Sequence, residues 1–328
     1  MNAATPPSAE SLRAALAGLL DGLPPTQAAK AVERLIANYR GTTPTDAPVL
    51  RDRSDVAAYA AYRMPATFEA VRSVLDALRD AASEWVPGTH TDVGGGTGAA
   101  SWAVAEAWEE APPRTTVLDW AEPALTLGRE LAAGAFDAEW RRERIGTALR
   151  LADADLVTVS YVLKELTEAD RTALVTEVAR AAQAVVIVEP GTPDGYERII
   201  AARTLLIDAG FTVAAPCPHS GACPIVPGTD WCHFSARVSR SSLHRQVKGG
   251  SLPYEDEKYS YVAATRFPVT PAVSRVTRRP QIRKGLVQLE LCGPDGLARE
   301  MVTKRHGPLY KQARNAEWGD SWPPETDA

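Results

Sequence analysis

Cysteine is scarce in this sequence and absent from most of it. The chain has four cysteines in 328 residues, and the first 216 residues have none. A cysteine nucleophile is therefore excluded from that part of the chain. Long apolar runs are also missing, because no stretch approaches the ~20 residues that a membrane-spanning helix requires. The opening residues lack a basic patch followed by an apolar stretch, and Glu10 lies where a mitochondrial presequence would avoid acid, so we expect a cytoplasmic protein with no membrane segment.

Negative charge dominates the chain as a whole but not its last third. The formal net charge is −5, whereas residues 235–316 hold sixteen lysines and arginines against six acids, a local net charge of +10. A basic segment on an acidic body suggests a polyanionic partner, most simply nucleic acid. A solvated basic face without a partner is the alternative.

The pattern of apolar residues divides the chain into three parts. Residues 1–85 repeat apolar side chains at helical spacing and predict a helical region. Residues 86–216 alternate short β-rich runs with helical segments, which is typical of βαβ units and a largely parallel sheet. Residues 217–328 hold strand-like runs without a long helical period, and Leu286–Thr303 is predicted to form a hairpin around a Gly-Pro-Asp-Gly turn.

A glycine-rich loop follows the first β-rich run and precedes a helical segment. Glycine allows the backbone to approach a ligand closely, and the helix N-terminus behind the loop favours negative groups. The sequence fits a dinucleotide-binding pattern, and it fits in full the D-x-G-x-G-x-G pattern of S-adenosylmethionine-dependent methyltransferases. The candidate cofactor-binding residues in this loop are Asp92, Gly94, Gly95, Gly96 and Gly98.

Two acids bear on the choice between these cofactors. Asp92 would lie badly beside a pyrophosphate, whereas it suits a ligand that carries an ammonium group, as the methionine part of S-adenosylmethionine does. Asp119 ends the next strand, where a carboxylate can accept both ribose hydroxyls of either cofactor. We therefore predict an α/β protein with a Rossmann-like, S-adenosylmethionine-dependent methyltransferase fold, and NAD remains the alternative cofactor.

The segment after the fourth β-rich run bears on catalysis. Enzymes that methylate exocyclic base amines usually carry an N-P-P-Y-like turn there, and this chain has Ser160–Leu166 (SYVLKEL) instead. Methylation of cytosine C5 needs a cysteine nucleophile, which this region lacks. Tyr161, Lys164 and Glu165 could act on a substrate, although helix capping or a surface role is the simpler interpretation. The sequence assigns no catalytic residue.

The cysteines are the candidate metal ligands, and they are Cys217, Cys223, Cys232 and Cys292. Three lie in one Pro- and Gly-rich segment directly after the sheet region, and the fourth ends a predicted hairpin strand. Four thiolates suit a tetrahedral zinc ion or an iron–sulfur cluster. Zinc sites usually use closely spaced pairs, whereas gaps of five and eight residues fit a bulkier cluster held by a wrapping loop. Four unconnected buried thiols are the remaining interpretation.

A compact group of basic residues lies inside the last third. The side chains expected to neutralise RNA phosphates are Arg278, Arg279, Arg283 and Lys284. Tyr259, Tyr261 and Phe267 could stack on bases, but the alternation of the two tyrosines favours packing within a strand.

Several segments together resemble the methyltransferase-like small-ribosomal-subunit assembly family, which has a mitochondrial branch and bacterial relatives. Between residues 55 and 320 the matching segments are AYAAYRMPAT, DVGGGTG, SYVLKEL, VEPGTPDGY, CPHSGACPIVPGTDWCHF, LPYEDEKYSYVA and YKQARNAEWGD. The cysteine segment and the DEKYSYVA segment are the most specific of these.

This resemblance implies a cofactor, a cluster and a partner. It implies a core that binds S-adenosylmethionine, and a 4Fe-4S cluster on the four cysteines, which would make the strand-rich C-terminal part an iron–sulfur module. It also implies binding to the small ribosomal subunit and its rRNA during assembly, and we expect a monomer when the protein is free. An active rRNA methyltransferase, and a small-molecule methyltransferase with a structural zinc site, are the alternative functions.

Overall fold

The computed structural model describes residues 6–20, 30, 32, 53–240 and 252–324. In its N-terminal part, residues 9–20 and 53–81 are helical. Helix α1 (Ala9–Leu20) packs on the long helix α3 (Arg53–Ala81), which continues through Pro65. Among the described residues, no helix is both long and apolar enough to cross a membrane.

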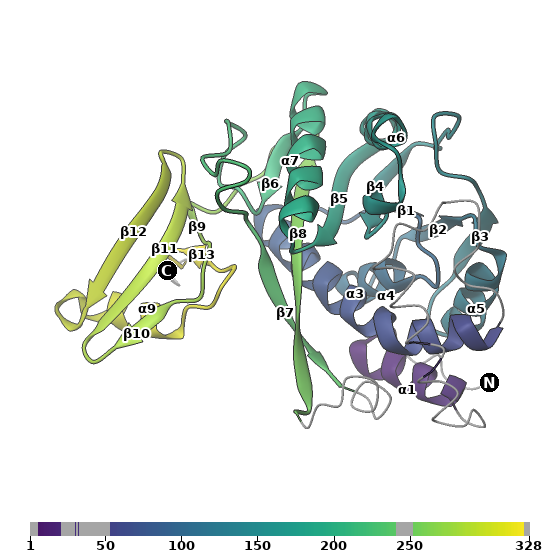
Figure 1. The fold of residues 1–328 in the computed structure, drawn as a ribbon, viewed down its shortest axis with the longest axis horizontal. Helices are drawn as coiled ribbons and strands as arrows, with labels where there is room; N and C mark the ends of the chain where they lie inside the picture. Colours follow the sequence, from purple (N-terminus) through teal and green to yellow (C-terminus); the bar gives the residue numbers. More distant parts are fainter. Residues whose placement is uncertain (1–5, 21–29, 31, 33–52, 241–251, 325–328) are drawn as a thin grey trace.

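A mixed sheet of eight strands, here called the main sheet, forms the centre of the protein (Figure 1). Its order is β3-β2-β1-β4-β5-β8-β6, with β7 also paired to β8. The first five strands are parallel, and β8 runs antiparallel to β5. Their bounds are β1 (Thr89–Val93), β2 (Arg114–Asp119), β3 (Ala138–Arg142), β4 (Ala154–Ser160), β5 (Ala182–Pro190), β6 (Thr212–Ala215), β7 (Phe234–Ser239) and β8 (Tyr254–Thr265).

Helices cover both faces of the main sheet because its central strands are apolar on both sides. In β5, Val186 and Val188 pack in the core under α3 and α4, whereas Val185 and Ile187 pack in the core under α6 and α7. This period of two predicts the two-layer cover. The helices between strands are α4 (Ala99–Ala107), α5 (Glu122–Ala132), η1 (Leu163–Glu165), α6 (Glu168–Ala181) and α7 (Pro193–Asp208).

Strands β6 and β7 are two parts of one interrupted edge strand. Tyr259 of β8 pairs with Pro190 of β5 on one side and with Phe234 of β7 on the other. Since β6 also pairs with β8 opposite β5, β6 and β7 follow the same edge in the same direction. The chain between them, residues 216–233, is an excursion from this edge, and we call it the cysteine loop because it carries three of the four cysteines.

The C-terminal residues form a second, smaller sheet of five strands. It begins at Ser274, so β7 and β8, which the sequence pattern assigns to the C-terminal module, belong to the main sheet instead. The physical reason is that the second half of β8 is apolar and fully buried beside β5. The predicted hairpin is confirmed by the pairing of β11 with β12. The elements are β9 (Ser274–Val276), β10 (Gln281–Arg283), β11 (Leu286–Gly293), β12 (Gly296–Thr303), η2 (Lys304–His306), α9 (Pro308–Asn315) and β13 (Ser321–Trp322).

Candidate functional site

The glycine loop lies between β1 and α4, at the carboxyl end of the parallel strands. Gly94, Gly96 and Gly98 all have positive φ, at 70°, 55° and 83°. A Cβ at Gly94 would overlap Cγ2 of Val162, and one at Gly98 would lie 2.7 Å from Cη2 of Trp140. The loop therefore needs glycine for its backbone conformation and for the space around it.

Asp119, the last residue of β2, lies beside this loop. Its Oδ2 accepts a hydrogen bond from the Gly96 amide at 2.9 Å, and its Oδ1 accepts one from the Ala121 amide at 2.8 Å. Burial raises the pKa of its carboxyl group above the ordinary value. The carboxylate thus fixes the loop against the end of β2, the edge where a Rossmann-type sheet holds a ribose.

Asp92 is placed inside the sheet. It is fully buried, and its two oxygens accept hydrogen bonds from the hydroxyls of Ser101 at 2.9 Å and Thr158 at 2.8 Å. Burial raises its pKa to about 6. Asp92 thereby ties β1 to α4 and β4, and its contact with a ligand ammonium stays a prediction.

A half-buried polar network lies at the carboxyl end of the sheet beyond β4. Tyr161, with a φ of 60°, donates its hydroxyl to Oε1 of Glu257 at 3.1 Å. Arg63 of α3 forms an ion pair with the same carboxylate at 3.1 Å, and its guanidinium carbon lies 5.5 Å from the centre of the Tyr161 ring. Sequence reasoning considered Tyr161 but missed Arg63 and Glu257, since nothing local marks residues so far apart as partners.

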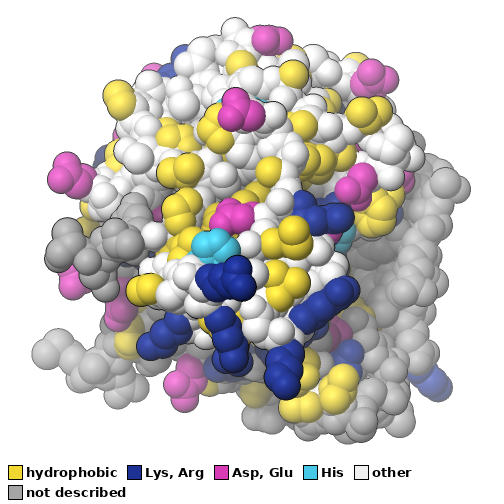
Figure 2. All heavy atoms as spheres, turned by 90° about the vertical axis from the view of Figure 1, so that its left-hand side faces the viewer, with side chains coloured by type: hydrophobic (Ala, Val, Ile, Leu, Met, Phe, Trp, Pro, Cys, Tyr) yellow, Lys and Arg dark blue, Asp and Glu magenta, His cyan; other side chains and the backbone are white. Residues whose placement is uncertain are grey.

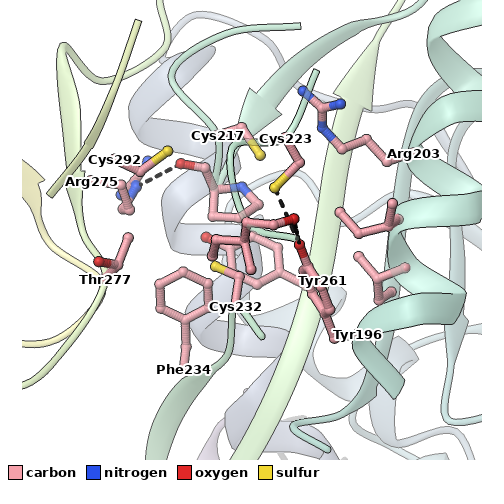
Figure 3. A pocket seen from close by; sticks show the side chains of 14 residues that line it. Tyr196, Arg203, Cys217, Cys223, Cys232, Phe234, Tyr261, Arg275, Thr277 and Cys292 are labelled. Atoms are coloured by element: carbon pink, nitrogen blue, oxygen red, sulfur yellow. Dashed lines mark hydrogen bonds between the residues drawn. The ribbon is translucent and has the colours of Figure 1, made fainter. Parts of the chain in front are cut away.

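The four cysteines line one pocket between the two sheets (Figure 3). Cys217, Cys223 and Cys232 come from the cysteine loop, and Cys292 comes from β11 of the second sheet. All four are free thiols. Within the described ranges, however, no group of three or more His, Cys, Asp or Glu side chains is arranged to hold a metal ion. The structure therefore brings the predicted ligands together without forming a compact ion site.

Burial favours the protonated form of three of these thiols. It raises the pKa of Cys217 and Cys232 above the ordinary value, and that of Cys292 to about 12. Arg203 opposes this effect at Cys217 through its charge and a hydrogen bond. A metal centre would have to displace these protons, so its binding would depend on pH.

Side chains from helix α7 and from strand β9 of the second sheet hold the cysteine loop in position. Arg203 of α7 donates through Nη2 to the carbonyls of His219 at 2.9 Å and Gly221 at 2.7 Å. Arg275 of β9 donates through Nε to the carbonyl of Pro216 at 3.1 Å. The hydroxyl of Tyr196 lies 3.2 Å from Sγ of Cys223. Neither arginine was singled out from the sequence, because both lie in ordinary helix or strand positions.

The predicted RNA-binding residues fall into two groups. Arg279, Arg283 and Lys284 are exposed. Arg278 instead forms an ion pair with Asp230 of the cysteine loop at 2.6 Å and donates to the carbonyl of Trp231. Figure 2 shows lysine and arginine side chains gathered on the side of the molecule that carries the second sheet, with hydrophobic side chains between them.

The strand order, the antiparallel strand β8 between β5 and β6, and the glycine loop after β1 define a Rossmann-like, methyltransferase-type fold. The chain belongs to the mitochondrial small ribosomal subunit Rsm22 family, whose profile matches residues 53–323. The family predicted from the sequence is thereby confirmed.

Individual relatives agree with this assignment. The human mitochondrial ribosome assembly protein METTL17 is 29% identical over 289 residues, which cover 81% of this chain and 62% of the human protein. Rsm22-cox11 tandem protein 2, mitochondrial, of Schizosaccharomyces pombe is 29% identical over 184 residues, or 43% of this chain and 24% of that protein. The chain thus spans less than two thirds of either relative. Among solved structures, magnesium protoporphyrin IX methyltransferase from Synechocystis matches with a TM-score of 0.40 and 16% identity, over 62% of this chain and 84% of that one.

Proposed function

We propose that this protein is an assembly factor of the small ribosomal subunit that binds 16S-type rRNA. The family match carries this proposal, because it extends from α3 through both sheets and so includes the basic second sheet as well as the core. The human relative bears the name of a ribosome assembly protein. The local net charge of +10 between residues 235 and 316 suits a phosphate backbone.

S-adenosylmethionine is the ligand that we propose for the glycine loop. The loop presents positive-φ glycines at the carboxyl ends of β1 and β2, and Asp119 lies at the position of a ribose-binding acid. Residues 86–216 contain neither an N-P-P-Y-like turn after β4 nor a cysteine nucleophile. We therefore propose that the cofactor is bound without transfer of its methyl group, with an active rRNA methyltransferase as the alternative.

We propose that the cysteine pocket binds a 4Fe-4S cluster, because its four cysteines are the donor set that such a cluster requires. Four free thiols, three from the cysteine loop and one from β11, line one pocket. Zinc sites usually use closely spaced cysteine pairs, so the gaps of five and eight residues in this chain favour the larger cluster. When bound, the cluster would cross-link the main and second sheets and supply folding free energy to the latter.

Anaerobic purification with analysis of iron and sulfide tests the cluster. We expect visible charge-transfer absorbance and about four irons per chain by the stoichiometry of such a cluster. A colourless protein that contains one zinc per chain would contradict the cluster and support the structural zinc site.

Co-sedimentation with immature small subunits tests the partner, and mass analysis of rRNA from a deletion strain tests methyl transfer. We expect the protein in the small-subunit fractions and no missing methyl group. Absence from those fractions would reject the assembly role and favour a small-molecule methyltransferase. Loss of one methyl group from the rRNA of the deletion strain would identify an active rRNA methyltransferase. We also propose that the protein is cytoplasmic and that it is a monomer when free. Fractionation of the same lysates tests the location, and a sizing column tests the oligomeric state.

A further inference from the structure

Arg203 is a buried cation with no acidic partner among the described residues. The residue is 5% exposed, and it lines the cysteine pocket from α7. Its Nη2 donates to two backbone carbonyls, but its Nε is buried without a hydrogen-bond partner in the part of the chain that is described. The ion pairs found in that same part do not include it, so its charge is balanced by no carboxylate there.

A buried charge of this kind requires compensation. Taking an ion out of water costs several kcal/mol unless an opposite charge lies nearby. Neutral thiols cannot provide that charge. Four thiolates around a zinc ion or an oxidised 4Fe-4S core retain a net charge of roughly −2, and such a centre would provide it. Arg203 lines this pocket from α7, and Arg275, which is also buried, lines it from the opposite side (Figure 3).

We propose that Arg203 is the counter-charge of a thiolate centre in the cysteine pocket, and a positioning residue for the loop that carries Cys217 and Cys223. The proposal rests on the proposed function in that it requires a metal centre there. The positioning part follows from the carbonyls of His219 and Gly221, which lie between those two cysteines in the chain. One side chain thus fixes the loop and compensates the charge that the loop would hold.

Two substitutions separate charge from geometry. Arg203→Gln keeps amide N–H donors for the carbonyls and removes the charge, whereas Arg203→Lys keeps the charge and removes the forked geometry. Arg266→Gln is the matched control, because Arg266 also donates to two carbonyls, those of Ala209 and Ala179, without lining the cysteine pocket.

The experiment measures metal release to a chelator and the reduction potential of the full-length protein, with circular dichroism to verify folding. For Arg203→Gln we expect metal affinity to fall by about 10- to 100-fold, and the potential to become more negative, because the reduced cluster carries one more negative charge. Arg203→Lys should stay near the wild-type potential, and Arg266→Gln should match the wild type in both measurements.

The outcomes distinguish this proposal from the proposed cofactor. A wild type that holds zinc would reject the cluster. The rate of zinc release from Arg203→Gln, compared with that from the wild type, would then test the counter-charge role of Arg203. Wild-type release and potential in Arg203→Gln would overturn the counter-charge. Equal reductions of affinity in folded Gln and Lys variants, with an unchanged potential, would also overturn it and leave only a structural role. A wild type that binds no metal at all would reject both proposals.

Discussion

Single glycines of the loop after β1 are constrained in two separate ways. Gly94 has a φ of 70°, and an added Cβ would overlap Val162. Gly134 has a φ of 84°, but nothing lies within 4 Å of an added Cβ. The pair therefore separates the energetic effect of the left-handed backbone from that of the missing space.

Gly94→Ala should destabilise the protein more than Gly134→Ala. The left-handed conformation costs an alanine about 1–2 kcal/mol at either position, and the overlap with Val162 adds to this only at Gly94. Urea unfolding gives both free energies, and calorimetry gives the affinity for S-adenosylmethionine. We expect a large decrease in affinity for Gly94→Ala alone, and equal behaviour of the two variants would contradict the steric argument.

Asp92 should make folding stability fall as the pH rises from about 4 to about 6. Its folded pKa of about 6 lies above the unfolded value, so the folded state binds more protons in this window. The shift of about 2 units corresponds to roughly 3 kcal/mol, which is lost fully above pH 6. Comparison of the wild type with Asp92→Asn across this range isolates the effect. A difference between the two proteins that does not change with pH would refute it.

Among the elements, α3, β8 and the end of β4 are joined by one carboxylate. Glu257 pairs with Arg63 and accepts the Tyr161 hydroxyl, and its side chain is 15% exposed. The preceding residue on the strand offers a contrast. Asp256 pairs with Arg237, but both side chains are more than 40% exposed. Glu257 and Asp256 are thus neighbours in the same strand, but the side chain of Glu257 is more buried.

Glu257→Gln should lower the free energy of unfolding by about 1–3 kcal/mol, because it leaves a largely buried guanidinium without its counter-charge. Asp256→Asn should change it by less than about 1 kcal/mol, since exposed pairs contribute little. Chemical denaturation measures both. Similar small effects would indicate that the network fills space without holding α3 to β8.

The sequence predicted those elements whose signals are local. The alternation in residues 86–216 indicated the parallel sheet, and the Gly-Pro-Asp-Gly turn indicated the β11–β12 hairpin. The sequence did not predict that β8 belongs to the main sheet. Its charged first half and its apolar second half have the same strand-like period, although the two halves pair with different strands. A strand that returns from a later part of the chain to insert beside β5 leaves no local pattern.

The candidate site was predictable to the same extent. Spacing selected the cysteines and the glycine loop, because both depend on residue type. Arg203, Arg63 and Glu257 could not be selected, since their importance comes from contacts with distant residues: 194 positions separate Arg63 from Glu257. Arg278 resembles its basic neighbours in the sequence, and its contacts with Asp230 and Trp231 of the cysteine loop distinguish it in the structure.

For the complete protein, the basic residues of the second sheet should set the salt dependence of RNA binding. Replacing the exposed Arg279, Arg283 and Lys284 with glutamine should reduce the salt slope by about one unit for each phosphate that is no longer neutralised. Arg278→Gln is the control, because its side chain already pairs with Asp230. Filter binding of small-subunit rRNA at several salt concentrations measures the slope. An unchanged salt slope in the triple variant would show that the RNA binds to another surface of the protein.

The interrupted edge strand also sets an order of events during synthesis. Cys217, Cys223 and Cys232 leave the ribosome before β8, to whose edge both ends of the cysteine loop are paired. Cys292 follows later still, on β11. The pocket can therefore acquire its fourth thiol only after β11 has been translated. A metal centre that needs all four thiols would bind after the main sheet has been synthesised.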